Sequence, residues 1–247
     1  MKEKKVLLMG NPNVGKSTVF NELTGMHQHT GNWTGKTVDS ADGNFYYKYN
    51  NYRLIDLPGT YSLIPSSEEE RVAGEYLLKE KYDCVVIVID STLLQRNLML
   101  FYQILEITNK VVVMLNLCDE AKKRNIEIDK NILSNLLGVP VIKATARSGK
   151  GINELLEEIH LISTNSEDYY SKKEYDLNKI DIENLAYKAE FVTNKAVTQA
   201  PSKKEKRDEF IDKIILGKYT SIPIMLIMFG IISVSYTHLR AHETTLH

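Results

Sequence analysis

The sequence predicts an α/β fold, in which helices cover both faces of a mostly parallel six-stranded sheet and a small all-α domain follows. Three observations predict this class. Short apolar runs alternate with helical segments through the first 160 residues. Two of these runs, residues 84–89 and 111–115, are continuously apolar, as expected of parallel strands buried on both faces. A polar stretch then precedes two further segments with helical periodicity.

Six runs are predicted as strands and five segments between them or after them as helices. The strands are residues 6–9, 44–49, 52–56, 84–90, 111–116 and 139–145, and the helices are residues 16–24, 67–79, 94–108, 129–137 and 151–163. The second and third strands alternate in polarity around Asn50 and Asn51, which predicts an antiparallel hairpin at one edge. Two overlapping capping boxes precede the second helix, formed by Ser66 with Glu69 and Ser67 with Glu70.

The C-terminal third of the chain is predicted to be helical after a polar linker. The linker spans residues 164–179, and apolar residues then recur on one helical face at Ile182, Leu185, Ala189, Val192 and Ala196. A further helix is predicted from Ser202 to about residue 217. The chain is thus predicted to divide into four parts: an α/β domain of residues 1–164, a small helical domain of residues 165–220, an apolar segment of residues 221–234 and a tail of residues 235–247.

Composition excludes several classes of protein. The chain has 247 residues, of which 43 % are hydrophobic and 26 % charged, so it is long and apolar enough to fold around a large core. Thirty-one basic against 32 acidic residues give a formal charge of −1, which argues against a nucleic-acid partner. The two cysteines, Cys84 and Cys118, supply no disulfide framework and suit a reducing compartment.

A phosphate-binding loop is predicted between the first strand and the first helix. Its residues are Gly10, Asn11, Pro12, Asn13, Val14, Gly15, Lys16 and Ser17, followed by Thr18. The glycines let backbone N–H groups approach a phosphate, and the helix N-terminus favours negative charge. Lys16 is expected to neutralise the β- and γ-phosphate oxygens, and the Ser17 hydroxyl to ligate Mg²⁺. The alternative is a glycine-rich turn without a ligand.

A second motif ends the third predicted strand. It consists of Asp56, Leu57, Pro58 and Gly59. We expect Asp56 to contribute to Mg²⁺ binding and the Gly59 N–H to face a γ-phosphate. In the polar loop of residues 26–37, Gly35 and Thr37 are predicted to lie at the nucleotide, with Thr37 completing the Mg²⁺ coordination.

A third motif, which selects the base, follows the fifth predicted strand. It consists of Asn116, Leu117, Cys118 and Asp119. The Asp119 carboxylate would accept the N1–H and N2–H₂ of guanine, whereas adenine would leave it unpaired. The same N-x-x-D pattern recurs at Asn165 and Asn178 in the polar linker region, so position after a buried strand decides the interpretation. The alternative is an ordinary turn in which the aspartate caps a helix.

The last predicted strand is followed by a short segment that would meet the base from the other side. This segment is Thr145, Ala146 and Arg147, and its backbone is predicted to approach the guanine O6. Taken together, the ordered motifs resemble those of a P-loop NTPase with the organisation of a G domain.

The motifs in this order resemble the cytosolic part of the ferrous iron transport protein B family. The resemblance rests on the phosphate loop and on residues 31–37, 56–63, 90–98, 116–122 and 139–142. It covers roughly residues 4–160 closely and continues more loosely into residues 210–213 and 222–224.

The resemblance implies GTP binding and slow hydrolysis, coupled to Fe²⁺ passage through a membrane domain. It implies that residues 165–220 act as a dissociation-inhibitor-like domain that slows GDP release. It also implies stimulation by K⁺, held partly by Asn13 and lying against the transferring phosphoryl charge. Further implied partners are the chain's own transmembrane iron-permeation domain, small accessory proteins and a homo-oligomer, at the cytoplasmic face of a bacterial inner membrane.

The sequence departs from the family at two positions. Lys36 stands where a small apolar residue is usual, and Thr60 follows Gly59, so no glutamine is present to orient the attacking water. Intrinsic turnover is therefore predicted to be slow, about 10⁻⁴ to 10⁻² s⁻¹. The residues predicted to act in hydrolysis are Lys16, Asn13, Thr37 and Gly59.

Residues 222–234 form an almost wholly apolar run near the end of the chain. Thirteen helical residues reach about 20 Å, which is short of the ~30 Å hydrocarbon core. Two interpretations follow: a short core or interfacial segment, or the first half of a transmembrane helix. The family resemblance favours the second, with residues 235–247 as a non-native tail.

Three other functions are compatible with a phosphate loop. A soluble ribosome-associated or other regulatory GTPase predicts a basic domain after residue 165, but that segment carries both signs of charge. A P-loop ATPase or kinase predicts ATP binding as tight as GTP binding. A non-catalytic binding module is compatible with Thr60.

Overall fold

The computed structural model describes residues 3–25, 29–32, 39–164, 180–199, 222, 223 and 229, with the backbone alone for residues 29–32, 39, 40 and 199. The chain forms two compact units, Met1–Gln199 and Ala200–His247. Only residues 222, 223 and 229 are described in the second unit, where they are helical and exposed. The first unit is an α/β domain, which confirms the predicted α/β fold with a mostly parallel sheet, while the small all-α domain after it remains a prediction.

A seven-stranded sheet runs through the first unit in the order β2-β3-β4-β1-β5-β6-β8. Its strands are β1 (Lys4–Gly10), β2 (His29–Asn32), β3 (Asp39–Tyr47), β4 (Asn50–Asp56), β5 (Cys84–Asp90), β6 (Val111–Asn116) and β8 (Val141–Lys143). The five strands from β4 to β8 in this order are parallel, and β3 and β2 add an antiparallel edge. The edge strand β2 lies inside the segment predicted as a loop.

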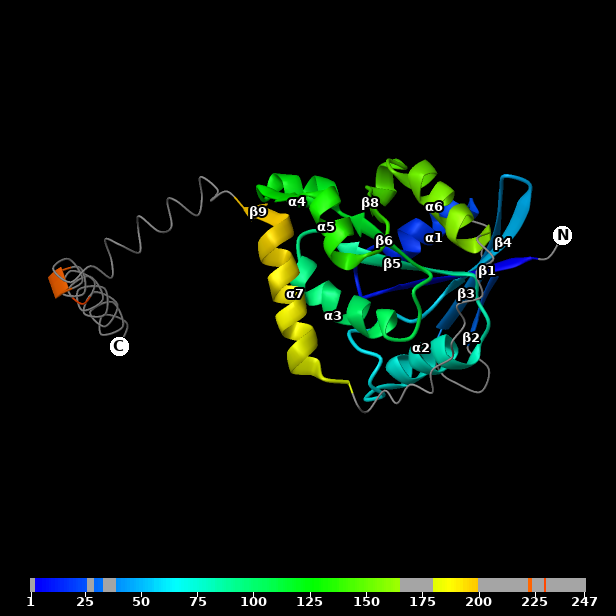
Figure 1. Cartoon of the computed structure of the whole chain (residues 1–247), viewed down its shortest axis with the longest axis horizontal. Coiled ribbons are helices and arrows are strands. Elements are labelled where there is room, and N and C mark those ends of the chain that lie inside the picture. The colour runs from blue at the N-terminus through cyan, green and yellow to red at the C-terminus, as the bar shows by residue number, and fades with distance from the viewer. Residues whose placement is uncertain are drawn as a thin grey trace, which may run out of the picture. The chain divides into compact units, whose positions relative to one another are not determined.

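Helices cover both faces of this sheet (Figure 1). They are α1 (Lys16–Thr24), α2 (Glu68–Lys79), α3 (Leu94–Leu105), α4 (Cys118–Lys123), α5 (Lys130–Leu137), α6 (Ile152–Thr164) and α7 (Ile182–Ala196). Because successive strand residues point to opposite faces, Leu7 and Met9 join one buried cluster while Val6 and Leu8 join the other. Helices α2, α3, α5 and α7 pack in the first cluster, and α1 and α6 pack in the second.

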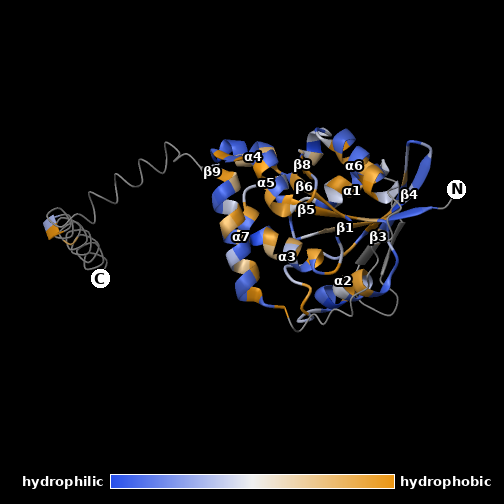
Figure 2. Ribbon diagram, in the orientation of Figure 1, coloured by the Kyte–Doolittle hydropathy of each residue, from blue (hydrophilic) through white to orange (hydrophobic). Residues whose placement is uncertain are grey.

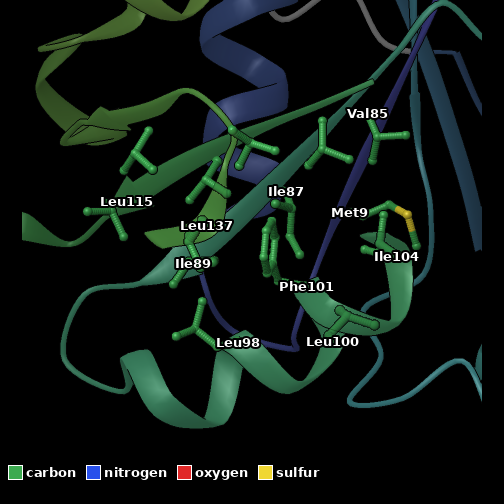
Figure 3. Packing of buried hydrophobic residues seen from close by; sticks show 14 of the residues in the cluster. Met9, Val85, Ile87, Ile89, Leu98, Leu100, Phe101, Ile104, Leu115 and Leu137 are labelled. Carbon is green, nitrogen blue, oxygen red and sulfur yellow. The ribbon is translucent and has the colours of Figure 1, made fainter. Parts of the chain in front are cut away.

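The strands that carry these clusters are the most hydrophobic part of the fold (Figure 2). In the first cluster the Phe101 ring of α3 lies beside Ile87 of β5 (Figure 3). All residues of β5 from Cys84 to Ile89 are fully buried, as the continuous apolar run predicts for a central parallel strand. A rigid sheet of this kind can position polar loops at its edge.

Local signals explain where the helices begin. Ser67 caps α2: its hydroxyl accepts from the Glu70 N–H at 3.2 Å, and the Glu70 carboxylate accepts from the Ser67 N–H at 3.1 Å. This confirms one of the two predicted capping boxes. Asp129 caps α5 with its side chain alone, by accepting from the N–H groups of Asn131 and Ile132.

The hairpin between β3 and β4 turns two residues earlier than the sequence suggests. Tyr47 pairs with Asn50, so the two-residue turn is Lys48 and Tyr49 rather than Asn50 and Asn51. Both turn residues have positive φ, 43° and 62°, as type I′ turns require. The Asn50 side chain stabilises the turn by donating to the Lys48 carbonyl at 2.9 Å.

Helix α7 packs within the first unit, although residues 165–220 are predicted to be a separate domain. Leu185, Ala189, Val192 and Ala196 are its buried residues, on the face that the sequence pattern predicts. The next residues form strand β9 (Val197–Gln199), which pairs with β7 (Ile126–Ile128) in a second, two-stranded sheet. The predicted domain divisions themselves remain predictions.

Within the described part of the chain, no helix combines the length and apolar character that crossing a membrane requires. Most of the apolar run of residues 222–234, and the whole tail after it, lie outside the described residues.

Candidate nucleotide-binding site

The three predicted motifs lie at the carboxyl ends of three parallel strands of the same sheet. The phosphate loop follows β1, Asp56 ends β4, and Asn116 ends β6. Strand β1 lies between β4 and β5, and the helix that follows β1 (α1) and the helix that follows β4 (α2) pack in the clusters on opposite faces of the sheet. Ligands of open α/β sheets bind at such a switch point, which makes this edge the candidate site.

Two glycines of the phosphate loop adopt positive φ angles and lie so close to neighbouring atoms that a Cβ would collide with them. Gly10 has a φ of 153°, and a Cβ there would lie 2.5 Å from the Val88 carbonyl oxygen. Gly15 has a φ of 91°, and its Cβ would lie 2.4 Å from Asn116 Nδ2. Asn13 is exposed and also has a positive φ, 64°. The loop therefore adopts a strained turn that presents backbone rather than side chains.

Lys16 and Asp56 bring the first two motifs together. Lys16 Nζ lies 3.5 Å from Asp56 Oδ1, and both side chains are largely shielded from water. Burial raises the pKa of Asp56, and the neighbouring Lys16 ammonium offsets part of that rise. Lys16 is the cationic neighbour of Asp56 Oδ1, and this buried oxygen makes no closer hydrogen bond within the described part of the chain.

Gly59 packs directly on the phosphate loop. A Cβ on Gly59 would lie 3.2 Å from Pro12 Cα and 3.5 Å from Lys16 Nζ. The next residue, Thr60, is buried and donates its N–H to the Gly10 carbonyl at 3.3 Å. Its hydroxyl donates to the Ser62 carbonyl at 2.6 Å and accepts from the Ser62 N–H at 3.2 Å. The Thr60 side chain is thus engaged within its own loop.

Asn116 joins the third motif to two other loops. Its Nδ2 donates to the Val14 carbonyl at 2.9 Å, and its Oδ1 accepts from the Ala146 N–H at 3.0 Å. The side chain is 2 % exposed, so both hydrogen bonds are shielded from water. One buried amide therefore holds the phosphate loop and the segment after β8 against the end of β6.

Asp119 does not play the capping role that is the alternative to base recognition. The residue at the N-cap of α4 is Leu117, which has a φ of 58°, and no side chain caps this helix. Asp119 lies in the first turn with its side chain exposed. By contrast, Asp181 of the N-x-x-D copy at Asn178 caps α7 by accepting from the Asn184 N–H. The two copies of the pattern have different roles.

The segment after β8 forms the remaining wall of the candidate site. Ala146 begins a short 3-10 helix (Ala146–Ser148), and Thr145 pairs with Lys150 in an isolated bridge. Ala146 is buried while Arg147 is exposed. The Cys118 side chain is engaged by neighbouring residues: its Sγ donates to the Leu115 carbonyl at 3.3 Å and lies 3.4 Å from Ser91 Oγ.

For five of the predicted site residues, the described structure shows no contact that would test the proposed role. Gly35 and Thr37 lie outside the described residues. Ser17 and Thr18 are exposed at the start of α1. Asn11 is 3 % exposed, and neither of its amide atoms has a hydrogen-bond partner among the described residues.

Sequence reasoning missed two buried polar residues that support the site. Ser91 Oγ donates to the Asn116 carbonyl at 2.7 Å, and Gln103 Oε1 accepts from the Leu63 N–H at 2.7 Å. Gln103 gives a weak sequence signal, because it is a polar residue on the mostly apolar buried face of α3. Ser91 gives none, because a serine after a strand is typical of any loop.

Comparison with known proteins identifies close relatives of this domain. A family model described as "Ferrous iron transport protein B" matches residues 4–159. The chain is 36 % identical over 239 residues to the Fe(2+) transporter FeoB of Campylobacter jejuni, a match that covers 94 % of this chain and 38 % of the relative. The chain thus spans well under half the length of that relative.

Solved structures agree with this match. The cytosolic domain of the T. maritima FeoB iron transporter in its GDP form I is 30 % identical, with a TM-score of 0.73, and the match covers 80 % of this chain and 99 % of that one. The GMPPNP form of the same domain is 31 % identical with a TM-score of 0.72, covering 79 % and 100 %. The likeness therefore extends through the whole of that domain.

Proposed function

The chain belongs to the ferrous iron transport protein B family, and from this premise we propose that it binds GTP and hydrolyses it slowly as the cytosolic module of a ferrous iron membrane transporter. The observation that carries the proposal is the contact between its three motifs. Lys16 lies 3.5 Å from Asp56, and Asn116 bonds to Val14 inside the phosphate loop. These contacts support a phosphate site and a base site that lie side by side at one edge of the sheet.

Guanine is the base that this arrangement favours. The Asp119 carboxylate is exposed and makes no helix cap, so it is free to accept both N–H groups of the guanine edge. Adenine offers an acceptor at N1 and would leave the carboxylate unpaired, a mismatch that such paired contacts reject by about 10⁴ or more. The relatives solved with GDP and GMPPNP support the same choice.

The residues present fit a magnesium ion. Mg²⁺ prefers oxygen ligands. Two oxygen-bearing side chains are available here: Ser17, which follows Lys16 in the sequence, and Asp56, which lies 3.5 Å from the Lys16 ammonium. Asp56 Oδ1 is a buried oxygen whose contact in the described part of the chain is the 3.5 Å ion pair with Lys16, and a bound cation would satisfy it further. The ion would neutralise phosphate charge, and Thr37 would complete its coordination.

Hydrolysis is expected to depend on positioning rather than on a side-chain base. The loop N–H groups and Lys16 would hold the phosphates, while the Gly59 N–H would face the γ-phosphate. The Thr60 hydroxyl donates its proton to the Ser62 carbonyl and accepts from the Ser62 N–H, so it does not offer a water molecule the side-chain donor and acceptor that a glutamine would present. Slow intrinsic turnover, about 10⁻⁴ to 10⁻² s⁻¹, follows from this arrangement.

A potassium ion is the proposed stimulator. Asn13 is exposed in a left-handed turn of the phosphate loop, where its side-chain oxygen could hold a monovalent cation beside the phosphoryl group. Single-turnover hydrolysis in K⁺ buffer should exceed that in Na⁺ buffer, and Asn13→Ala should remove the difference. Equal rates in both buffers would eliminate this role.

The remaining parts of the proposal concern the whole transporter. Nucleotide state would switch the loops around Thr37 and Gly59 and so act on a membrane domain that conducts Fe²⁺. Residues 165–220 would slow GDP release, and residues 221–234 would begin the first membrane helix. Accessory proteins, a homo-oligomer and a position at the cytoplasmic face of a bacterial inner membrane belong to the same proposal.

Nucleotide competition on the full chain tests the central statement. Fluorescent GDP bound with Mg²⁺ should be displaced by GTP and GDP but not by ATP at similar concentrations. ATP displacement as strong as GTP displacement would exclude the role of Asp119 and favour a P-loop ATPase or kinase.

A further inference from the structure

Helix α3 holds the segment that follows Gly59. Gln103, in the last turn of α3, is only 2 % exposed. Its Oε1 accepts two hydrogen bonds from this segment, from the Leu63 N–H at 2.7 Å and from Ser62 Oγ at 3.1 Å. A buried side-chain acceptor with two donors from one loop restrains that loop strongly.

The other end of the same segment is bonded to the phosphate loop. Thr60 N–H donates to the Gly10 carbonyl, and the Thr60 hydroxyl bonds to Ser62 on both its N–H and its carbonyl. Residues 60–63 therefore form a short hydrogen-bonded unit between Gly10 and Gln103. Gly59 is the residue directly before this unit.

Gln103 is itself fixed by the packing of α3. The helix contributes four fully buried residues to one cluster (Figure 3), namely Leu98, Leu100, Phe101 and Ile104. Leu63 is fully buried in the same cluster. An exposed contact adds to the restraint, because the Arg96 guanidinium lies 4.3 Å from the centre of the Tyr61 ring. Movement of residues 60–63 would have to break the Gln103 hydrogen bonds or shift a packed helix.

We propose that Gln103 is a positioning residue for the nucleotide site: by holding residues 60–63 it keeps the Gly59 N–H at the phosphate loop and so favours a nucleoside triphosphate over a diphosphate. This inference rests on the proposed function, because the γ-phosphate is the group that Gly59 would contact. GDP lacks that phosphate, so its binding should not depend on Gln103.

The test compares GDP and GMPPNP affinities for the full chain and three variants. Gln103→Met keeps the size of the side chain but removes the acceptor, and should weaken GMPPNP binding about 5- to 10-fold while GDP binding stays within twofold. Gln103→Glu keeps an acceptor oxygen for both donors and should restore most of the loss. Ile104→Val removes packing from the same helix but none of the hydrogen bonds to residues 60–63, so it should lower the melting temperature and leave the affinity ratio unchanged.

The outcomes separate the two claims. A wild-type chain that binds neither nucleotide would refute the proposed function itself. A wild-type chain that binds both, with Gln103→Met altering neither or both equally, would overturn the role of Gln103 alone. Should Gln103→Met fail to fold, Ser62→Ala removes one of the two donors and should still weaken GMPPNP about twofold relative to GDP; an unchanged ratio there would also refute the role.

Discussion

Asn116 Nδ2 donates to the Val14 carbonyl across 2.9 Å, which joins residues 102 positions apart in the chain. Because Asn116 Oδ1 also accepts from the Ala146 N–H, a single amide connects the phosphate loop with the loop after β8. The base-recognition motif is therefore a structural brace as well as a candidate ligand contact, and its loss should be measurable before any nucleotide is added.

Replacing Asn116 should destabilise the nucleotide-free protein. Asn116→Ala removes two buried hydrogen bonds and leaves the Val14 carbonyl and the Ala146 N–H without partners, at a cost of about 2–4 kcal/mol in the free energy of unfolding. Urea denaturation measures this loss. Asn50→Ala is the control: its amide bonds to a carbonyl in an exposed turn, and its effect should stay within about 0.5 kcal/mol. Equal effects of the two variants would contradict the bracing role.

A side chain at Gly15 should disrupt the same brace by collision. The Cβ of Gly15→Ala would lie 2.4 Å from Asn116 Nδ2, in a backbone conformation with φ of 91°. Guanine nucleotide affinity should fall by at least about 100-fold, since the loop and Asn116 cannot both keep their positions. Titration with fluorescent GDP measures the change.

Gly138→Ala separates collision from backbone strain. Gly138 also has a positive φ, 69°, but a Cβ there would meet no atom within 4 Å. That variant should cost about 1 kcal/mol of stability and leave GDP affinity unchanged. Comparable loss of GDP binding in both alanine variants would show that strain, not the contact with Asn116, explains the Gly15 result.

Central elements of the fold could be predicted from sequence, because strong local patterns determine them. The bounds of α1, β5 and β6 agree with the predicted residues, since a phosphate loop precedes the first and continuous apolar runs define the other two. The hairpin turn was predicted at Asn50 and Asn51, whose residue types favour turns. Tertiary pairing of Tyr47 with Asn50 instead places the less typical residues Lys48 and Tyr49 in the turn.

The parts that could not be predicted depend on contacts between distant residues. Strand β7 has only three residues and exists because β9, about 70 residues later, pairs with it. The support of the site by Gln103 likewise depends on the approach of residues 62 and 63 to α3, which no local pattern encodes. Residue types predicted which side chains carry chemistry, while their bracing appears only in the folded chain.

Magnesium-dependent binding should weaken at low pH because of Asp56. Burial raises the pKa of this carboxyl in the nucleotide-free fold, against a partial opposing effect of Lys16. As the pH falls, the folded chain therefore takes up this proton before the unfolded chain does. The protonated Asp56 stabilises the fold most at a pH below the ordinary carboxyl pKa, and this stabilisation is lost as the pH rises through the raised pKa. Mg²⁺ needs the ionised form and competes with that proton.

The Mg²⁺-dependent part of GDP affinity should accordingly decrease as the pH is lowered through the raised pKa of Asp56, by up to about tenfold per pH unit. GDP titrations with Mg²⁺ and with a chelator, from neutral pH toward about 4, measure this. Asp56→Asn should remove both the Mg²⁺ effect and its pH dependence. A pH dependence that persists in Asp56→Asn would assign the titration to another group.

Base specificity should change in a defined direction when Asp119 is replaced. Asp119→Asn exchanges one carboxylate oxygen for an N–H₂ donor, so the side chain then offers one acceptor and one donor. Guanine presents two donors at this edge and would lose one partner, whereas xanthine presents the N1–H donor beside the O2 acceptor and would match the amide. We expect guanine nucleotide affinity to fall by about 100-fold or more and xanthine nucleotide affinity to rise.

Asp181→Asn is the matched control, because Asp181 belongs to the same N-x-x-D pattern but caps α7, and asparagine is an equally good cap. That variant should leave both affinities unchanged; if Asp119→Asn behaves in the same way, the carboxylate is not the group that reads the base.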